Sequence, residues 1–519
     1  MTSHSIGIRS LAVSFPSLIR TNDYWYEKFP ELAVQAQPKR VRLPRTSQST
    51  SNDDGIEIWS QEVAPYLNDP FRGNVERRVL SHDESPLTLE YRAAKEALEA
   101  ANLHPEEVEL AICASQQRFA IATSLFCEPI GLSNTSSLVR QLNLHCPAWN
   151  LESTCSSALV ALQNARALVQ TGEYRNVLVV VSQFGSNTVD DEDTLSWSMG
   201  DGAGAFVVSA LKPNQGVLGT KIISTTATCG AYSHELVTDA QGVPRMRTRT
   251  GENASMLAET AVDFVRTCCK EAATAAGVSL EGIDFFAFNT PTAWYASVCT
   301  RALGIDPERT INLYPRYANI GPVLPIANLY HATRSGKLRE NDLVLVYTNG
   351  AGATAGAMVM RWGDVALGAV PAPPISVTPE QEKIRLAGAD SRSQENPPIH
   401  QTETLSREQL LAAEPEKRRQ MLETYLIGWL TTTLQLPPNQ FTPQQSFASL
   451  LDSLMALMFR SRIETDLQVQ VPMESFFGDN TIAQLSEQLL NQLVLVNLIA
   501  TEPIDAAKTH EEEREKLSL

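Results

Sequence analysis

The 519-residue chain lacks the features that would direct it to a membrane, to secretion or to nucleic acid. No apolar run approaches the roughly 20 residues that span a bilayer. The amino-terminal MTSHSIGIRS has no cationic region followed by an apolar core, so we expect no signal peptide. The net charge of −17 argues against nucleic acid or an anionic membrane surface as a partner.

Cysteine is sparse and follows no metal or disulfide pattern. The eight cysteines are scattered, Cys268 and Cys269 are adjacent, and no C-x-x-C pair offers a zinc site. A dinucleotide-binding fingerprint is also missing, because the Gly-Ala-Gly at 202–204 has no third glycine and no Rossmann setting. These absences predict a cytoplasmic protein without a metal centre or a bound dinucleotide.

The composition is that of a globular protein, and 519 residues are too many for a single core. Through residues 1–362 apolar stretches of strand length alternate with amphipathic helical stretches. We expect strands over 5–15, 108–113, 176–181, 283–288 and 342–348, and helices over 87–101, 258–276 and 295–303. This alternation predicts an α/β fold with mainly parallel strand pairing. Two Gly-Ala-Gly segments, at 202–204 and 350–352, hint that the fold is duplicated.

The character of the chain changes after residue 362. Proline and polar residues dominate 363–405, which predicts an extended linker. Residues 406–495 form a helix-rich stretch, and the tail 496–519 ends in the charged HEEEREKLSL. Two interpretations of the tail stay open, a solvated or disordered end and a docking segment for a partner protein.

The stretch 150–160 places a cysteine where a nucleophile is expected. An extended polar lead ends at Cys155, and small residues at 156–158 then open an amphipathic run. Unpaired N–H groups and the dipole at a helix N-terminus favour the thiolate, which is the form that attacks thioesters. The small residues also leave room for an acyl chain beside the sulfur. A buried structural cysteine is the alternative.

Several motifs then occur in a fixed order: Ile6-Gly7-Ile8, Pro16, Thr21-Asn22, Glu76-Arg77-Arg78, the Cys155 stretch, Gly200-Asp201-Gly202-Ala203-Gly204-Ala205, Tyr317-Ala318-Asn319 and Gly350-Ala351-Gly352. Together they resemble the 3-oxoacyl-acyl-carrier-protein synthase III group of the thiolase superfamily. The resemblance implies a duplicated five-layer αβαβα fold, with halves at 1–212 and 213–362, usually as a homodimer. It also implies an acyltransferase with acyl-coenzyme A or acyl-carrier-protein substrates.

Residues 406–495 resemble an acyl-carrier protein of the polyketide synthase type, a small four-helix domain. The matching residues are Asp452-Ser453-Leu454-Met455-Ala456-Leu457, Arg460, Glu464, Pro472, Phe476-Phe477 and Thr481-Ile482-Ala483. The resemblance implies that Ser453 carries covalent 4′-phosphopantetheine. The usual Leu-Gly-x-Asp-Ser lead is altered, because FASLLDS at 447–453 has no glycine and one residue fewer.

In the synthase family the cysteine works with a histidine and an asparagine, which stabilise the thioester oxygen and the enolate formed when a malonyl group loses CO2. By its Tyr-Ala-Asn context, Asn319 fills the asparagine position. The histidine position holds Asn289, since the chain reads Phe-Asn-Thr-Pro where the 3-hydroxy-3-methylglutaryl synthase branch has Phe-His-x-Pro. The resemblance therefore implies a site of Cys155, Asn289 and Asn319. The N–H of Cys155 and the Gly350 loop would form the oxyanion hole.

Asn289 retains a hydrogen-bond donor for an oxyanion, but it cannot relay a proton or supply a cation that lowers the pKa of Cys155. Possible substitutes are His331, His234, His145 and Glu152, although a plain core, surface or turn role is favoured for each. Four aromatic residues either line an acyl tunnel or belong to the core: Phe184, Trp197, Phe288 and Trp294.

Three functions stay open. In the first, an acyl group on Cys155 is condensed with a malonyl thioester or handed to the Ser453 arm, in polyketide or fatty-acyl biosynthesis, and the tail docks a downstream polyketide synthase. In the second, a non-decarboxylating acyltransferase makes an ester, an amide or a carrier thioester. In the third, the synthase part is an inactive scaffold and only the carrier domain works.

Overall fold

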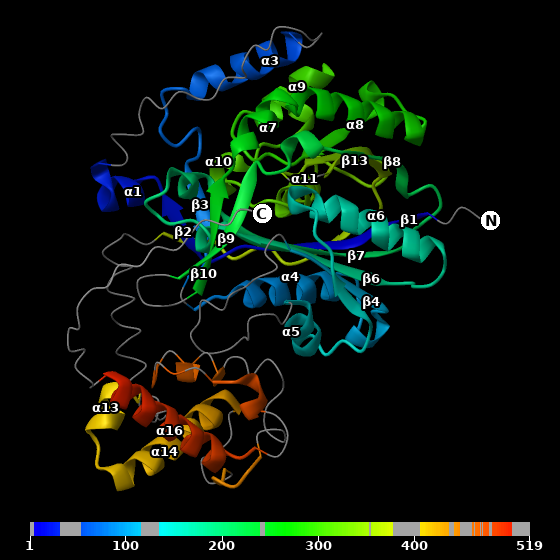
Figure 1. Cartoon of the computed structure of the whole chain (residues 1–519). Coiled ribbons are helices and arrows are strands. Elements are labelled where there is room, and N and C mark those ends of the chain that lie inside the picture. The colour runs from blue at the N-terminus through cyan, green and yellow to red at the C-terminus, as the bar shows by residue number, and fades with distance from the viewer. Residues whose placement is uncertain are drawn as a thin grey trace, which may run out of the picture. The chain divides into compact units, whose positions relative to one another are not determined.

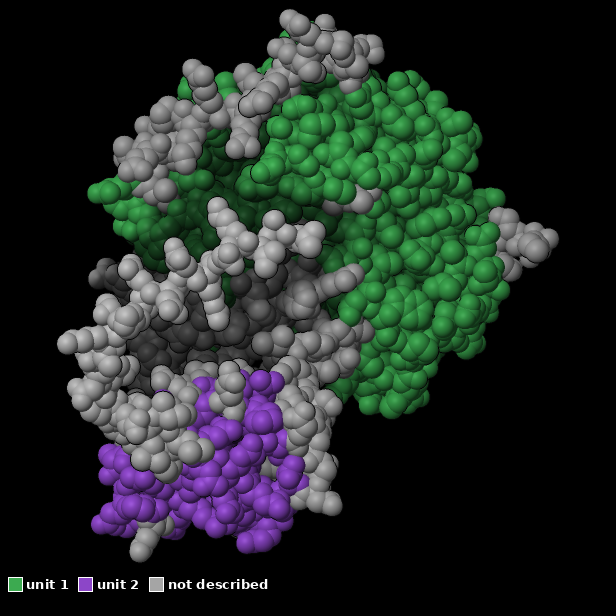
Figure 2. Space-filling view, in the orientation of Figure 1, with its two compact units in different colours: residues 1–389 green, residues 390–519 purple. Residues whose placement is uncertain are grey.

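The computed structural model describes most of the chain: residues 5–31, 53–81, 83–115, 134–238, 244–351, 354–376, 405–434 and 441–446, and residues 459–500 apart from 461, 465, 468, 470 and 477–479. The chain divides into two compact units, residues 1–389 and residues 390–519 (Figure 2). Ser453 lies outside the described residues, as do its neighbours from 447 to 458. No helix in the described part of the chain has the length and hydropathy of a membrane span.

One six-stranded sheet forms the amino-terminal half of the first unit (Figure 1). Its strands, in spatial order, are β14 (Ala366–Leu367), β1 (Ile6–Ser14), β7 (Asp201–Ala210), β6 (Val177–Phe184), β4 (Leu110–Ser115) and β5 (Ala148–Asn150). All eight residues of β6 are buried because helices cover both faces. Successive side chains of β6 alternate between the two: Val177 and Val179 face α6 (Ser157–Gln170), whereas Leu178 and Val180 face α4 (Pro86–Ala100).

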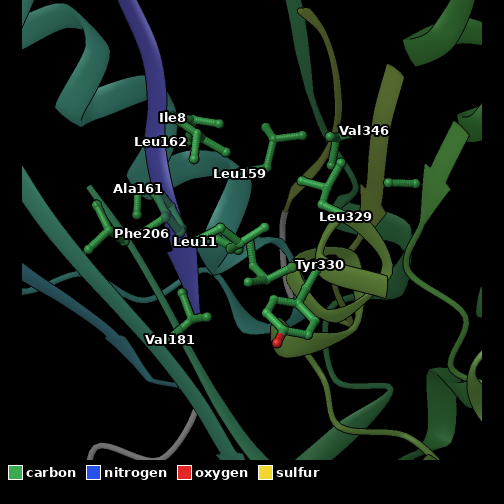
Figure 3. Packing of buried hydrophobic residues seen from close by; sticks show 14 of the residues in the cluster. Ile8, Leu11, Leu159, Ala161, Leu162, Val181, Phe206, Leu329, Tyr330 and Val346 are labelled. Atoms are coloured by element: carbon green, nitrogen blue, oxygen red, sulfur yellow. The ribbon is translucent and has the colours of Figure 1, made fainter. Parts of the chain in front are cut away.

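A four-stranded sheet forms the carboxy-terminal half. Its order is β11 (Phe285–Phe288), β12 (Leu343–Asn349), β13 (Thr354–Arg361) and β8 (Gly216–Ser224). One face packs against α8 (Ala261–Ala276) and α9 (Tyr295–Leu303), and the other packs against α11 (Val323–Arg334). Both α6 and α11 lie in the shared core between the sheets, where Leu159 and Leu162 belong to the same cluster of buried residues as Leu329 and Tyr330 (Figure 3). The result is the expected five-layer arrangement of helices and sheets.

The two halves have the same topology. The series β1-β7-β6-β4 and the series β8-β13-β12-β11 each contain two antiparallel pairings followed by one parallel pairing. This confirms the duplicated fold. The expectation of mainly parallel pairing is wrong, because β7 and β13 run antiparallel to both of their neighbours in the middle of each sheet.

Gly202 and Gly204 lie inside β7. A Cβ at Gly204 would lie 2.9 Å from the side chain of Ile326 on α11, and one at Gly202 would lie 3.3 Å from Phe15. The glycines therefore let the central helix approach the strand closely.

Smaller elements complete the first unit. They are β2 (Leu18–Thr21), β3 (Glu76–Val79), the hairpin of β9 (Tyr232–Thr238) and β10 (Pro244–Thr250), and the helices α1 (Asp23–Lys28), α3 (Asp53–Val63), α5 (Asn134–Gln141), α7 (Met256–Glu259) and α10 (Tyr314–Tyr317). Part of the expected linker is ordered here, since β14 pairs with β1 and β15 (Ile375–Ser376) pairs with β2.

The second unit is helical in its described residues. Its elements are α13 (Arg407–Ala412), α14 (Pro415–Leu434), a short 3-10 turn (Met473–Phe476) and α16 (Ile482–Ala500). Leu422, Leu426, Phe459, Ile463 and Leu489 are fully buried in one core. This core is compatible with the small all-α carrier domain that the sequence predicts.

Candidate active site

Cys155 lies in a tight 3-10 turn, Thr154–Ser156, that leads directly into α6. Thr154 has a φ of +47°, a left-handed conformation that is costly for a β-branched residue. The Ser157 hydroxyl stabilises the turn, because it donates to the Thr154 carbonyl at 2.6 Å and accepts from the Ser153 N–H at 2.8 Å. The thiol is thus held in a strained elbow at a helix N-terminus.

The Gly350 loop packs directly against this elbow. A Cβ at Gly350 would clash with Thr154 Oγ1 and lie 3.0 Å from the Ser153 carbonyl oxygen, so only glycine fits. The Gly350 N–H donates to the Thr354 carbonyl at 3.0 Å, and the Ser156 hydroxyl donates to the same oxygen at 2.9 Å. The N–H of the next residue, Ala351, is the one that reaches the sulfur of Cys155.

Burial dominates the electrostatics of the thiol. It raises the pKa of Cys155 to about 11, even though the backbone N–H groups of Ala351 and Cys155 and the Asn289 side chain act in the opposite direction. Only 7% of the Cys155 surface is exposed. The helix N-terminus therefore does not produce a resting thiolate, and Cys155 is a neutral thiol at rest.

Asn289 follows β11 and is 1% exposed. Its Nδ2 donates to two backbone carbonyls, that of Cys155 at 3.3 Å and that of Gly321 at 3.2 Å. Its Oδ1 is buried and has no hydrogen-bond partner in the described part of the chain. The side chain is therefore fixed beside the nucleophile by its amino group.

Asn319 lies in the loop between α10 and α11 and is tied to a neighbouring turn. Its N–H donates to the Ser198 carbonyl at 2.9 Å, and its carbonyl accepts from the Gly200 N–H at 3.2 Å. Ala318 precedes it with φ +55° and ψ −155°, a region that is essentially restricted to glycine. Like Cys155, Asn319 follows a strained residue.

One peptide unit connects the two asparagines. The Gly321 N–H donates to Asn319 Oδ1 at 2.9 Å, and the Gly321 carbonyl accepts from Asn289 Nδ2. Gly321 has a φ of +52°, which favours glycine at this position. The structure thus connects Cys155, Asn289 and Asn319 in one network, with the two amides turned in opposite directions.

Tyr232, at the start of β9, is a neighbour that sequence reasoning missed. Burial raises the pKa of Tyr232, and the nearby Cys155 thiol raises it further. The hairpin that supplies it carries no motif, and no spacing in the sequence links it to Cys155.

Of the residues considered as substitutes for the histidine, His331 is engaged away from Cys155. His331 forms a hydrogen bond of 3.1 Å with Tyr317 and packs among aromatic rings, and burial lowers its pKa. His145 and Glu152 are exposed. The side chain of His234 lies outside the described residues.

The four aromatic candidates for an acyl tunnel are all buried. Phe184 belongs to the core beneath α4, whereas Phe288 and Trp294 belong to the core beneath α8 and α9. Trp197 packs against Phe71 at 4.6 Å between ring centroids. The described residues also bring together no cluster of metal-binding side chains.

Comparison with protein families gives three matches. The family model of 3-oxoacyl-[acyl-carrier-protein] synthase III matches residues 149–226, its C-terminal counterpart matches 273–362, and the phosphopantetheine attachment site matches 425–489.

The chain is also similar to individual synthases. The beta-ketoacyl-[acyl-carrier-protein] synthase III of Sphingopyxis alaskensis is 30% identical over 292 residues, which cover 55% of this chain and 86% of that protein. The synthase of Aquifex aeolicus is 29% identical over 296 residues, covering 56% and 89%. A crystal structure of the synthase III from that organism aligns with a TM-score of 0.52 at 25% identity, over 69% of this chain and all of that one. OleA from Xanthomonas campestris shares the fold, with a TM-score of 0.54 at 19% identity over 69% of this chain and 98% of that one.

Proposed function

Because the chain belongs to the 3-oxoacyl-[acyl-carrier-protein] synthase III family, we propose that it acts through an acyl-enzyme on Cys155. Its family makes it an acyltransferase, and it has a phosphopantetheine-binding carrier domain of its own. We propose coenzyme A or carrier thioesters as acyl donors and a role in fatty-acyl or polyketide biosynthesis.

The observation that carries the proposal is the Cys155 elbow beside two amides and a backbone N–H. The N–H groups of Ala351 and Cys155 can donate to the oxygen of a tetrahedral intermediate, which is the role of an oxyanion hole. Asn319 accepts a hydrogen bond through Oδ1, so its amino group is the end available to a substrate oxygen. Since the thiol is neutral at rest, it must lose its proton as it attacks the incoming thioester.

The carrier arm is proposed to be attached at Ser453. This residue lies outside the described residues, so its assignment depends on the Asp452-Ser453-Leu454 motif and on the match to the phosphopantetheine attachment site over residues 425–489. When bound, 4′-phosphopantetheine supplies a thiol on a long arm that holds an acyl group as a thioester.

We also propose a homodimer paired through β5. This strand is at the edge of its sheet and Trp149 on it is 39% exposed. Edge strands of two copies can extend a sheet across an interface. Size-exclusion chromatography with light scattering would test it, and a monomer for the full chain would contradict it.

Intact mass spectrometry tests the proposed acyl-enzyme. The full chain is treated with a phosphopantetheinyl transferase and acyl-coenzyme A, and peptides containing Cys155 and Ser453 are then analysed separately. We expect acylation of Cys155 in the parent and its loss in Cys155→Ala, with Ser453→Ala as the control that removes only the arm. Modification of Ser453 without any acylation of Cys155 would instead favour the scaffold function.

A further inference from the structure

We infer that Asn289 acts as a hydrogen-bond acceptor, and that the second substrate therefore attacks with a hydroxyl, amino or thiol group rather than with the carbanion of a malonyl group. This inference rests on the proposed acyl-enzyme at Cys155. It concerns only what removes the acyl group from the sulfur.

The orientation of the Asn289 amide is the first step of the argument. Two carbonyl oxygens, from Cys155 and Gly321, lie 3.3 and 3.2 Å from Nδ2. A carbonyl oxygen only accepts hydrogen bonds, so it requires the amino end of the amide. Turning the amide around would place Oδ1 against both carbonyls, which would be repulsive. The backbone therefore fixes Asn289 with its oxygen as the unpartnered end.

The location of that oxygen is the second step. Nδ2 lies 3.3 Å from the carbonyl oxygen of Cys155, and Oδ1 is attached to the same carbon. Oδ1 is also buried and lacks a partner among the described residues. A buried acceptor without a partner costs roughly 1–3 kcal/mol, so a donor brought by a substrate would relieve that cost.

An enolate would be poorly stabilised beside Oδ1 of Asn289. Decarboxylation of a malonyl thioester develops negative charge on its oxygen, which needs donors. The amino group of Asn289 already donates to two backbone carbonyls, and the lone pairs of Oδ1 would repel the charge. A protic nucleophile presents the opposite polarity, because its hydrogen can point at Oδ1.

Gly321 makes the two amides complementary. Its N–H holds Asn319 by the oxygen, and its carbonyl holds Asn289 by the nitrogen. Asn319 therefore offers a donor for the thioester oxygen, whereas Asn289 offers an acceptor for the hydrogen of the attacking group.

The transfer step balances with these groups alone. The lone pair of the attacking oxygen, nitrogen or sulfur forms a bond to the acyl carbon while its hydrogen is directed to Oδ1. The carbon–sulfur bond breaks, its electron pair goes to the sulfur of Cys155, and that sulfur takes the proton. Because the buried thiolate is strongly basic, it is a competent acceptor for the proton. The products are an ester, amide or thioester and the neutral thiol.

The experiment separates loading from transfer. The full chain is loaded with acetyl-, hexanoyl- or dodecanoyl-coenzyme A, and acylation of Cys155 is measured by intact mass. The loaded enzyme is then mixed with N-acetylcysteamine, ethanolamine or malonyl-coenzyme A, and products and released CO2 are quantified. We expect acyl transfer to a protic acceptor, and release of CO2 at least ~100-fold slower than in the Asn289→His variant, because one oxyanion donor is worth about 10²–10³-fold.

Two variants make the result specific. Asn289→His introduces a donor at this position, and Asn289→Ala removes the acceptor, so Asn289→Ala should transfer to protic acceptors about tenfold more slowly once each transfer rate is normalised to the fraction of Cys155 that is loaded. If the parent forms a 3-oxo product from malonyl-coenzyme A as fast as Asn289→His, or loads but transfers to no protic acceptor, the inference is wrong. If a variant fails to fold, the second of these outcomes still tests the inference, because it needs only the parent. If no thioester loads Cys155, the proposed function itself fails, and the inference fails with it.

Discussion

The two halves of the synthase unit have the same strand order but contribute different chemistry. In the amino-terminal half, Cys155 precedes α6 immediately. In the carboxy-terminal half, Asn319 lies four residues before α11 begins at Val323. Both follow a non-glycine residue with positive φ, Thr154 in one half and Ala318 in the other. A strained residue therefore precedes Cys155 in one half and Asn319 in the other. The number of residues between each of them and the following helix differs.

The number of residues before the helix determines which backbone groups surround Cys155 and Asn319. Cys155 lies at the start of α6, and its own N–H and that of Ala351 act on its sulfur, which suits an anionic sulfur or oxygen. Asn319 has a loop between it and its helix, and Gly321 in that loop orients both amides. Each half therefore has a positive-φ residue shortly before a central helix, and the loop of the carboxy-terminal half orients the two amides beside Cys155.

Removal of the nucleophile has the largest expected effect. Cys155→Ala should abolish acyl loading and lower turnover by at least ~10³-fold, because no other residue in the network can form the thioester. The measurement is intact mass together with release of free coenzyme A. Cys229→Ala, which removes an exposed thiol, is the matched control and should load normally. Loading that persists in Cys155→Ala would assign the nucleophile elsewhere.

Removal of the amide from the opposite half should have the next largest effect. Asn319→Ala deletes the proposed donor for the thioester oxygen, and we expect turnover to fall by about 10²–10³-fold. It also frees the Gly321 N–H, which orients the peptide that holds Asn289. Steady-state kinetics give the value, and far-UV circular dichroism checks the fold. A loss of turnover of less than about threefold would mean that Asn319 does not take part in the reaction.

The pH dependence of loading tests how burial and the helix N-terminus compete at Cys155. The pKa of the thiol is about 11, so the thiolate fraction rises with pH throughout the neutral and mildly alkaline range. We expect the rate of acylation to rise about tenfold per pH unit from pH 7 to 10 and to level off near pH 11. Stopped-flow measurement of coenzyme A release gives the profile. A plateau already at pH 7 would mean that the N–H groups outweigh burial.

Much of this candidate site could be predicted because its residues lie in recognisable local sequence patterns. Three local patterns indicated the backbone around them: the small residues after Cys155, the Tyr-Ala-Asn context of Asn319 and the repeated Gly-Ala-Gly segments. The orientation of Asn289 was not predictable, since it depends on the carbonyls of Cys155 and Gly321, which are 134 and 32 positions away. The pKa of Cys155 and the proximity of Tyr232 likewise follow from tertiary burial. The alternation of strands and helices predicts the fold class, but it cannot show that β7 and β13 run antiparallel to their neighbours.

The smallest expected effect concerns the strained turns themselves. Ala318→Gly relieves a conformation that costs about 1–3 kcal/mol, and the greater entropy of glycine in the unfolded chain offsets about 0.5–1 kcal/mol of that. We therefore expect a net gain of about 1 kcal/mol in the free energy of unfolding. Thr154→Gly should gain a similar amount, because it also removes a buried hydroxyl that has no partner in the described residues.

The matched control for this pair is Asn102→Gly. Asn102 is exposed and has a φ of +52°, but asparagine tolerates that region, so its replacement should change the free energy of unfolding by less than about 0.5 kcal/mol. Urea unfolding of the three variants measures the differences. If Thr154→Gly and Ala318→Gly gain stability but lose turnover, the strain holds Cys155 and Asn319 in place, as the equivalence of the two turns implies. If neither gains stability, the left-handed residues are not strained, and the halves share only their topology.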